Sequence, residues 1–248
     1  MAASGGDSPE VDLRSTLNRI LDAHGGLDYW RSLCSVDLEM SAHGFLFRAK
    51  YVPLQRHVRL TISTRKPEVT LHDYPLAGQR AILHGAQRVE IVDASGEVLQ
   101  TRADPRAAFT HWRRSLYWDA LDFAYFSGYA MWNYTNLPFL LTEPGFVAES
   151  LAAPAGMTRL KVTFPPDLPT HSPTQELLFD RSGRLTRHDY TAKVVGSWAK
   201  AAHLCQDYRQ FGGLLMPTRR RVYPAGPFSR PLPVPTLVAI EIHDALPM

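Results

Sequence analysis

Residues 174–190 read Thr-Gln-Glu-Leu-Leu-Phe-Asp-Arg-Ser-Gly-Arg-Leu-Thr-Arg-His-Asp-Tyr, and this stretch is the strongest indication of the fold. It places two strand-like runs on either side of Asp180-Arg181-Ser182-Gly183, a turn in which glycine takes the position that needs a positive φ. A turn of the same Asp-x-Ser-Gly type, at residues 93–96, separates the runs 89–92 and 98–101. Both stretches are expected to form hairpins of antiparallel strands.

Alternation of apolar and polar residues extends this pattern from Cys34 to about Gln100, and strands return from Gly145 to the end. Ser8-Pro9 is typical of a helix start, and Gly25-Gly26 of a helix end. A second helical region is expected from Asp104-Pro105 to about Asn136, closed by Pro138. The predicted class is α+β: one strongly curved antiparallel sheet, an incomplete barrel, with the N-terminal helix and aromatic mid-chain helices covering its concave face.

The expected organisation is a single domain over residues 8–248, with residues 1–7 as a flexible tail and residues 104–139 as a helical lid segment. A length of 248 residues lies within the range of β-rich single domains. Hydrophobic residues make up 45% of the chain and charged residues 21%, which is ordinary globular composition.

Charge and hydropathy argue against two classes of partner. The net charge is +3 and the basic residues are scattered, the densest run being Arg219-Arg220-Arg221, so no nucleic acid is expected. No apolar run is long enough for membrane insertion. The N-terminus has neither the basic nor the apolar region of a secretory signal, which favours a cytoplasmic location with Cys34 and Cys205 reduced, although one disulfide would also fit.

Sequence motifs for common cofactors do not occur in the chain. It contains no Gly-x-x-x-x-Gly-Lys, no Gly-x-Gly-x-x-Gly after a strand, no Gly-x-Ser-x-Gly, no His-Glu-x-x-His and no Cys-x-x-Cys. Nucleotide use, nicotinamide chemistry and structural zinc are therefore not expected, and no cofactor is predicted.

Three motifs resemble the LolA/LolB-type lipoprotein-carrier superfamily. They are His24-Gly25-Gly26-Leu27 with Trp30, Asp180-x-x-Gly183-x-Leu185, and Asp207-Tyr208-Arg209-x-Phe211-x-Gly213-Leu214-x-x-Pro217. The segments Thr170-His171-Ser172 and His188-Asp189-Tyr190 also resemble actinobacterial proteins without an assigned activity. The superfamily resemblance implies an incomplete β-barrel whose helices close an apolar cavity for acyl chains. Because the export signal and lipidated cysteine of that superfamily are missing, another hydrophobic guest is expected.

Hairpin geometry predicts one group of polar residues on a common face. A three-residue loop with a glycine bulge at 180–183 pairs Glu176 with His188. Two-residue turns at Gly196-Ser197 and Gly212-Gly213 then pair Tyr190 with His203, His188 with Cys205, and Arg220 with Cys205. Since side chains alternate between faces, this register collects six side chains on one face: Glu176, His188, Tyr190, His203, Asp207 and Arg220.

Such a set suits proton transfer without a cofactor if its face lines the cavity. Histidine titrates near neutral pH, and a carboxylate such as Asp207 could orient His203. Tyr190 could donate to a developing oxyanion, and Arg220 could hold a substrate carboxylate. The candidate catalytic residues are His188, Tyr190, His203, Asp207 and Glu176.

Two other interpretations of this face stay open. The face could be the solvated outer one, because the opposite face carries Leu177, Phe179 and Leu185. His188 and His203 could instead join a carboxylate to bind a metal, although paired histidines on strands are usually only hydrogen-bonded. His171 could point into the same mouth or simply cap its loop.

The mid-chain segment is rich in aromatic residues, which could be lid or core. We expect Tyr129, Trp132, Tyr134 and Phe139, with Arg220, to bind substrate over an apolar pocket, because ligand pockets are mostly apolar with a few placed polar groups. Ordinary packing of a helix on a sheet is the alternative.

The sequence therefore predicts a protein that binds a hydrophobic small molecule in a barrel cavity. The leading hypothesis is a cofactor-independent acid–base enzyme of secondary metabolism, of isomerase, cyclase or hydratase type. The alternatives are a non-catalytic carrier or sensor of a lipid-like ligand, and an interaction module using the proline-rich loop 224–235.

Overall fold

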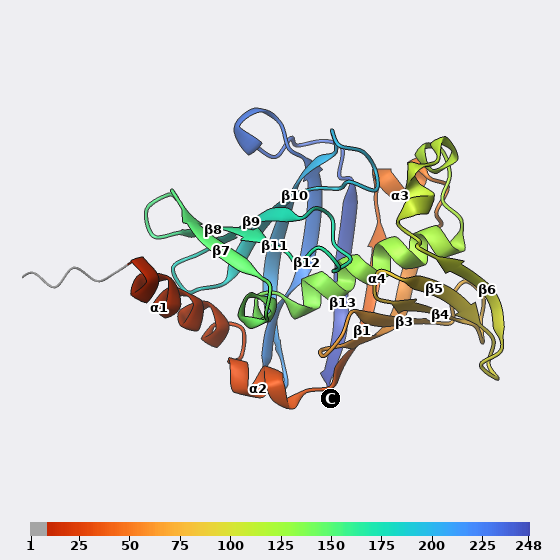
Figure 1. Cartoon of the computed structure of the whole chain (residues 1–248), viewed down its shortest axis with the longest axis horizontal. Helices are drawn as coiled ribbons and strands as arrows, with labels where there is room; N and C mark the ends of the chain where they lie inside the picture. Colours follow the sequence, from red (N-terminus) through yellow and green to blue (C-terminus); the bar gives the residue numbers. More distant parts are fainter. Residues whose placement is uncertain (1–8) are drawn as a thin grey trace, which may run out of the picture.

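The computed structural model describes residues 9–248, so the expected tail and the Ser8 cap lie outside the described residues. Thirteen strands form one antiparallel sheet that is curved and open, in the order β6-β5-β4-β3-β2-β1-β13-β12-β11-β10-β9-β8-β7 (Figure 1). The strands are β1 (Ser35–His43), β2 (Gln55–Ser63), β3 (Glu68–His72), β4 (Arg80–His84), β5 (Arg88–Val92), β6 (Val98–Ala103), β7 (Val147–Leu151), β8 (Thr158–Thr163), β9 (Thr174–Phe179), β10 (Leu185–Thr191), β11 (Lys200–Phe211), β12 (Leu214–Pro224) and β13 (Val238–Pro247). The predicted α+β class with a curved antiparallel sheet is confirmed.

Four α-helices accompany the sheet: α1 (Pro9–Asp22), α2 (Leu27–Ser32), α3 (Phe45–Ala49) and α4 (Ala120–Asn136). Short 3₁₀ turns lie at η1 (Ala107–Thr110), η2 (Trp112–Ser115), η3 (Phe139–Thr142) and η4 (Pro227–Ser229). The region expected to be helical from residue 104 is thus fully helical only in α4. The short helix α3 falls in a segment that was expected to be all strand. No helix of the described chain is long and apolar enough to cross a membrane.

Helix α4 fills the concave side of the sheet and packs against β2–β5 (Figure 1). Every residue from Leu121 to Asn136 is buried, as expected of a helix that is enclosed on all sides. A capping box begins the helix, because Asp119 accepts from the backbone N–H of Asp122 and Asp122 accepts from that of Asp119. Arg102 of β6 and Arg114 pair with both aspartates and fix this end of α4 to the sheet edge.

Both Asp-x-Ser-Gly turns form the predicted hairpins by the same local hydrogen bonds. Oδ1 of Asp180 accepts from the backbone N–H groups of Ser182 and Arg184, at 2.8 and 3.1 Å. Oδ1 of Asp93 accepts from Ser95 and Glu97 in the same way. The aspartate side chain thus replaces a backbone acceptor in each turn.

The predicted registers need two corrections. A bulge at Thr186 lies between the pairs Leu185–Phe179 and Arg187–Leu178, so Glu176 is opposite Asp189 instead of His188. The connection from β10 to β11 is longer than a two-residue turn, because Val195 and Gly196 both donate to the Ala192 carbonyl. The first change moves side chains to the other face, whereas the second shifts the pairing by two residues and keeps the face.

Pairing of β11 with β12 agrees with the prediction. Arg220 lies opposite Cys205, and Phe211 lies opposite Leu214 across the turn at Gly212-Gly213. In the same turn, the Gly213 carbonyl lies directly beside Gly25, which is one of the two glycines predicted to end the first helix. Gly25 has φ +119°, and a Cβ there would lie 2.2 Å from the Gly213 oxygen.

We expect Gly25→Ala to lower the free energy of unfolding by about 3 kcal/mol, because it combines backbone strain with a clash against fixed backbone. Gly26→Ala is the matched control: its φ of +85° and ψ of 148° also disfavour a side chain, but the added methyl group meets nothing within 4 Å, so a smaller loss of about 2 kcal/mol is expected from backbone strain alone. Urea denaturation of both variants measures the difference. Equal losses would show that the contact with Gly213 does not matter.

Candidate functional site

Strands β10, β11 and β12 bring four of the six predicted polar residues to the concave face beneath α4. His188 and His203 are directly opposite each other, with ring centroids 5.8 Å apart, and neither ring is exposed to solvent. Tyr190 lies two residues further along β10 and packs edge-on against His188. Arg220 completes the group from β12, with only 2% of its surface exposed. These four residues therefore lie on the buried inner face of the sheet, and Tyr190 is the one among them that belongs to the wall of an apolar cavity.

A chain of hydrogen bonds joins this group to α4 through His171. The Tyr190 hydroxyl lies 2.8 Å from that of Tyr134, which lies 2.7 Å from Nε2 of His171. Nδ1 of His171 lies 3.2 Å from the Tyr129 hydroxyl, and the His171 ring stacks on Tyr190 at 3.9 Å. In one consistent assignment Tyr190 donates to Tyr134, Tyr134 to His171, and His171 to Tyr129.

A second chain holds His188 from the side of β9. Its Nε2 lies 2.5 Å from Oε1 of Gln175, whose amide nitrogen donates to the Thr170 hydroxyl and the Ser172 carbonyl. Thr170, His171 and Ser172 belong to one loop, so both chains end in the same short segment. Asn133 of α4 fixes that segment by donating to the Pro169 carbonyl at 2.9 Å.

Arg220 is buried without a carboxylate partner among the described residues. Its Nη2 donates to the Tyr134 carbonyl at 3.1 Å, and its Nη1 donates to Sγ of Cys205 at 3.4 Å. The guanidinium also lies over the Tyr134 ring, 5.1 Å from its centroid. A permanent positive charge is therefore held by a carbonyl, a sulfur atom and a π-face.

Burial keeps the histidines of the cluster uncharged at neutral pH. It lowers the pKa of His188 to about 3, with a further contribution from Arg220. It also lowers the pKa values of His171 and His203 well below the usual value, and raises that of Tyr134 well above it. A proton that moves through this region would therefore pass between hydrogen-bonded groups that are uncharged at rest.

Several buried polar atoms of the cluster have no hydrogen-bond partner among the described protein groups. They include Nδ1 of His188, both ring nitrogens of His203 and Nε of Arg220. Such atoms are exceptions in protein interiors.

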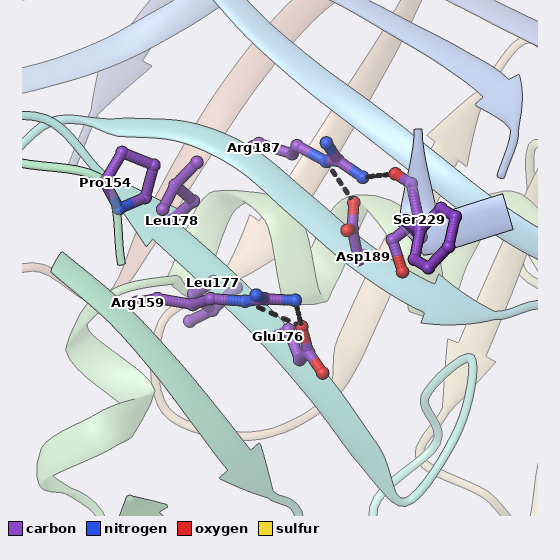
Figure 2. Close-up of a pocket in the computed structure, with 9 residues that line it drawn as sticks. Pro154, Arg159, Glu176, Leu177, Leu178, Arg187, Asp189 and Ser229 are labelled. Carbon is purple, nitrogen blue, oxygen red and sulfur yellow. Dashed lines mark hydrogen bonds and ion pairs between the residues drawn. The ribbon is translucent and has the colours of Figure 1, made fainter. Parts of the chain in front are cut away.

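Glu176 and Asp207 do not join the cluster, so their predicted placement is wrong. Glu176 lies on the outer face in a pair with Arg159, next to a second pair between Arg187 and Asp189 (Figure 2). The bulge in β10 removes the register that would have placed it beside His188. Asp207 has φ +54°, which breaks the alternation of β11, and its exposed carboxylate lies 3.7 Å from Arg219.

The four aromatic residues expected to bind substrate fall into two pairs. Tyr129 and Tyr134 belong to the cluster. Trp132 faces the other way and donates to the Ser63 carbonyl at 3.0 Å, and Phe139 stacks on Trp30 at 4.5 Å. For this second pair the ordinary packing interpretation describes what the structure shows.

An apolar cavity of about 490 Å³ opens beside the cluster, where β10 and β12 end and β11 and β13 begin, next to α3. Phe126 of α4 and Tyr190 belong to its wall, so Tyr190 borders both the cavity and the buried chain of hydrogen bonds. Trp198, which is 77% exposed, stands at the rim. Lys50 also belongs to the wall.

Sequence reasoning missed Gln175 and Lys50 and left His171 undecided. His171 follows the proline-rich run 165–169, and its neighbours Thr170 and Ser172 are the available sequence signal for an ordered loop. Lys50 carries no signal, because it follows Phe-Leu-Phe-Arg-Ala, a run without clear period. Within the described residues no group of three or more His, Cys, Asp or Glu side chains could hold a metal ion.

The solved structures with a similar fold include two from bacteria. One is a LolA superfamily protein from Nitrosomonas europaea and the other a DUF1329 family protein from Desulfovibrio piger. Each is 12% identical, with a TM-score of 0.50 and coverage of 94% of this chain and 92% of the other. The predicted LolA-type fold is thereby confirmed. No protein-family model and no curated protein matches the sequence.

Acid is expected to destabilise the protein through its buried histidines. Their folded-state pKa values lie below the unfolded value of about 6.5, so the unfolded chain binds protons first and stability falls as pH drops below 6.5. His203→Phe should reduce the slope of stability against pH below 6.5 by up to about 1.4 kcal/mol per pH unit, the value for one proton. Urea denaturation at several pH values measures this slope.

The control for this experiment is His43→Phe, because His43 is exposed. It should keep the slope of the wild-type protein. An unchanged slope in His203→Phe would mean that His203 is not buried in its neutral form.

Proposed function

We propose, taking the LolA-type fold as the premise, that this protein binds a hydrophobic small molecule in the cavity beside α3. The observation that carries the proposal is the cavity itself, whose volume of about 490 Å³ lies within the range of about 300–1,000 Å³ usual for ligand sites. Its wall is mainly aliphatic and aromatic, including Phe126, Val222 and Leu237. Polar groups are few, as in sites where apolar contact supplies affinity and a few polar contacts fix orientation.

Filling the cavity should abolish binding of an apolar ligand. Ala199→Trp places a large side chain on the wall, so the affinity for the neutral dye Nile red should fall at least tenfold. Ala94→Trp, at the exposed tip of a hairpin, is the matched control and should bind like wild type. Fluorescence titration measures both. Equal binding by wild type and Ala199→Trp would place the dye elsewhere and contradict the proposal.

A second candidate function is acid–base catalysis on the bound molecule. The observation that favours it concerns Tyr190, which belongs to the cavity wall and is also the first residue of the hydrogen-bonded chain that continues through Tyr134 to His171. If the Tyr190 oxygen took a proton from a ligand, the Tyr190 hydroxyl proton could move to Tyr134 and the Tyr134 proton to Nε2 of His171, which accepts it. The chain would thus connect the cavity with a buried base that is neutral at pH 7.

Tyr190→Phe separates the two candidate functions. A hydrophobic ligand that co-purifies with the protein would be extracted, returned to the protein in D₂O, and followed by mass spectrometry. An enzyme of isomerase or cyclase type should exchange or rearrange the ligand, and Tyr190→Phe should slow this by roughly 100-fold. A carrier should leave the ligand unchanged, with affinity within threefold in the variant. An unchanged ligand with wild-type protein would contradict the catalytic candidate.

A further inference from the structure

Lys50 places a cationic group in a wall that is otherwise mainly apolar. The residue follows α3 directly, where its backbone N–H donates to the carbonyls of Leu46 and Phe47, and only 7% of its surface is exposed. The Lys50 carbonyl accepts from Trp118 at 3.1 Å, which ties this position to the segment preceding α4. The backbone of Lys50 is thus fixed beside the cavity by α3 and by the segment before α4.

The charge of Lys50 has no anionic partner in the described part of the chain. No carboxylate belongs to the cavity wall, and none forms an ion pair with Lys50. Its Nζ donates to the Ser115 carbonyl, a single neutral acceptor for a group with three donors. Burial accordingly lowers the pKa of Lys50.

An ammonium group in such surroundings is unfavourable unless an anion or further acceptors compensate it. A methionine would fill the same place in an apolar wall without that cost. Within residues 9–248 no ion pair uses this charge, whereas an anion entering the cavity would contact both Lys50 and the apolar surface next to it. The position therefore matches a molecule with one charged end and one apolar body.

We infer that the ligand is a long-chain carboxylate, bound with its carboxylate on Nζ of Lys50 and its chain along Phe126, Val222 and Leu237. This inference rests on the proposed binding function and adds the class of ligand. A carboxylate fits better than a phosphate, because one ammonium group faces a mainly apolar wall and balances a single negative charge. Lys200, the other lysine of the wall, is exposed and belongs to the rim.

The test compares two ligands that differ only at the polar end, dodecanoate and dodecan-1-ol, by displacement of Nile red. Wild-type protein should bind dodecanoate at least tenfold more tightly than dodecan-1-ol. Lys50→Met should bind the two within twofold of each other, with its affinity for dodecan-1-ol unchanged within twofold. Lys50→Arg should keep the preference for the carboxylate.

Lys193→Met is the matched control, because Lys193 is exposed and is not part of the wall. It should keep the wild-type preference. Lys50→Gln serves if Lys50→Met does not fold, as judged by circular dichroism.

The outcomes separate this inference from the proposed function. If dodecan-1-ol binds but dodecanoate is not preferred, or if the neutral variants keep the preference, the inference is wrong and the binding function stands. If Nile red and both ligands fail to bind wild-type protein, the proposed function fails and the inference fails with it.

Discussion

Complete burial of α4 is the constraint on which the rest of the structure depends. A helix whose residues from Leu121 to Asn136 are all buried needs apolar partners on every side, and a flat sheet covers only one side. The sheet therefore curves around α4 (Figure 1), and its inner face supplies residues such as Leu71, Leu83 and Ile91 that are almost fully buried. The ion pairs of Asp119 and Asp122 with Arg102 hold the start of the helix against β6, an edge strand of the sheet.

The same constraint creates the polar cluster. Polar side chains of α4 cannot reach water, so Tyr129, Tyr134 and Asn133 take partners from the loop 169–171 and from β10. Arg220 donates to the Tyr134 carbonyl and lies over the Tyr134 ring, where a carboxylate would be the usual partner. The result is a region whose charge and hydrogen bonds are set by one helix, next to a cavity that shares Tyr190 with it.

Local patterns in the sequence were sufficient for the class of fold, the two Asp-x-Ser-Gly hairpins and the register of β11 with β12, because each depends on residues close together in the chain. They were also sufficient to place His188, Tyr190, His203 and Arg220 on one face. Glu176 was misplaced because a bulge at Thr186 has no sequence marker, and Asp207 because its positive φ interrupts a strand. The roles of Gln175 and Lys50 come from contacts with residues that are distant in sequence, and no local sequence pattern reveals such contacts.

The strand order has a consequence for how the chain can assemble. Every pairing in the sheet joins strands that are neighbours in sequence, except the one between β1 and β13. Strands β1–β6 and β7–β13 are therefore two meanders, each built by closing short loops, and the single seam between them joins residues near opposite ends of the described chain. Because closing a longer loop costs more conformational entropy, this seam is the least local step of folding. Until it forms, each meander presents the unpaired edge of a long strand, the feature through which sheets pair with other chains.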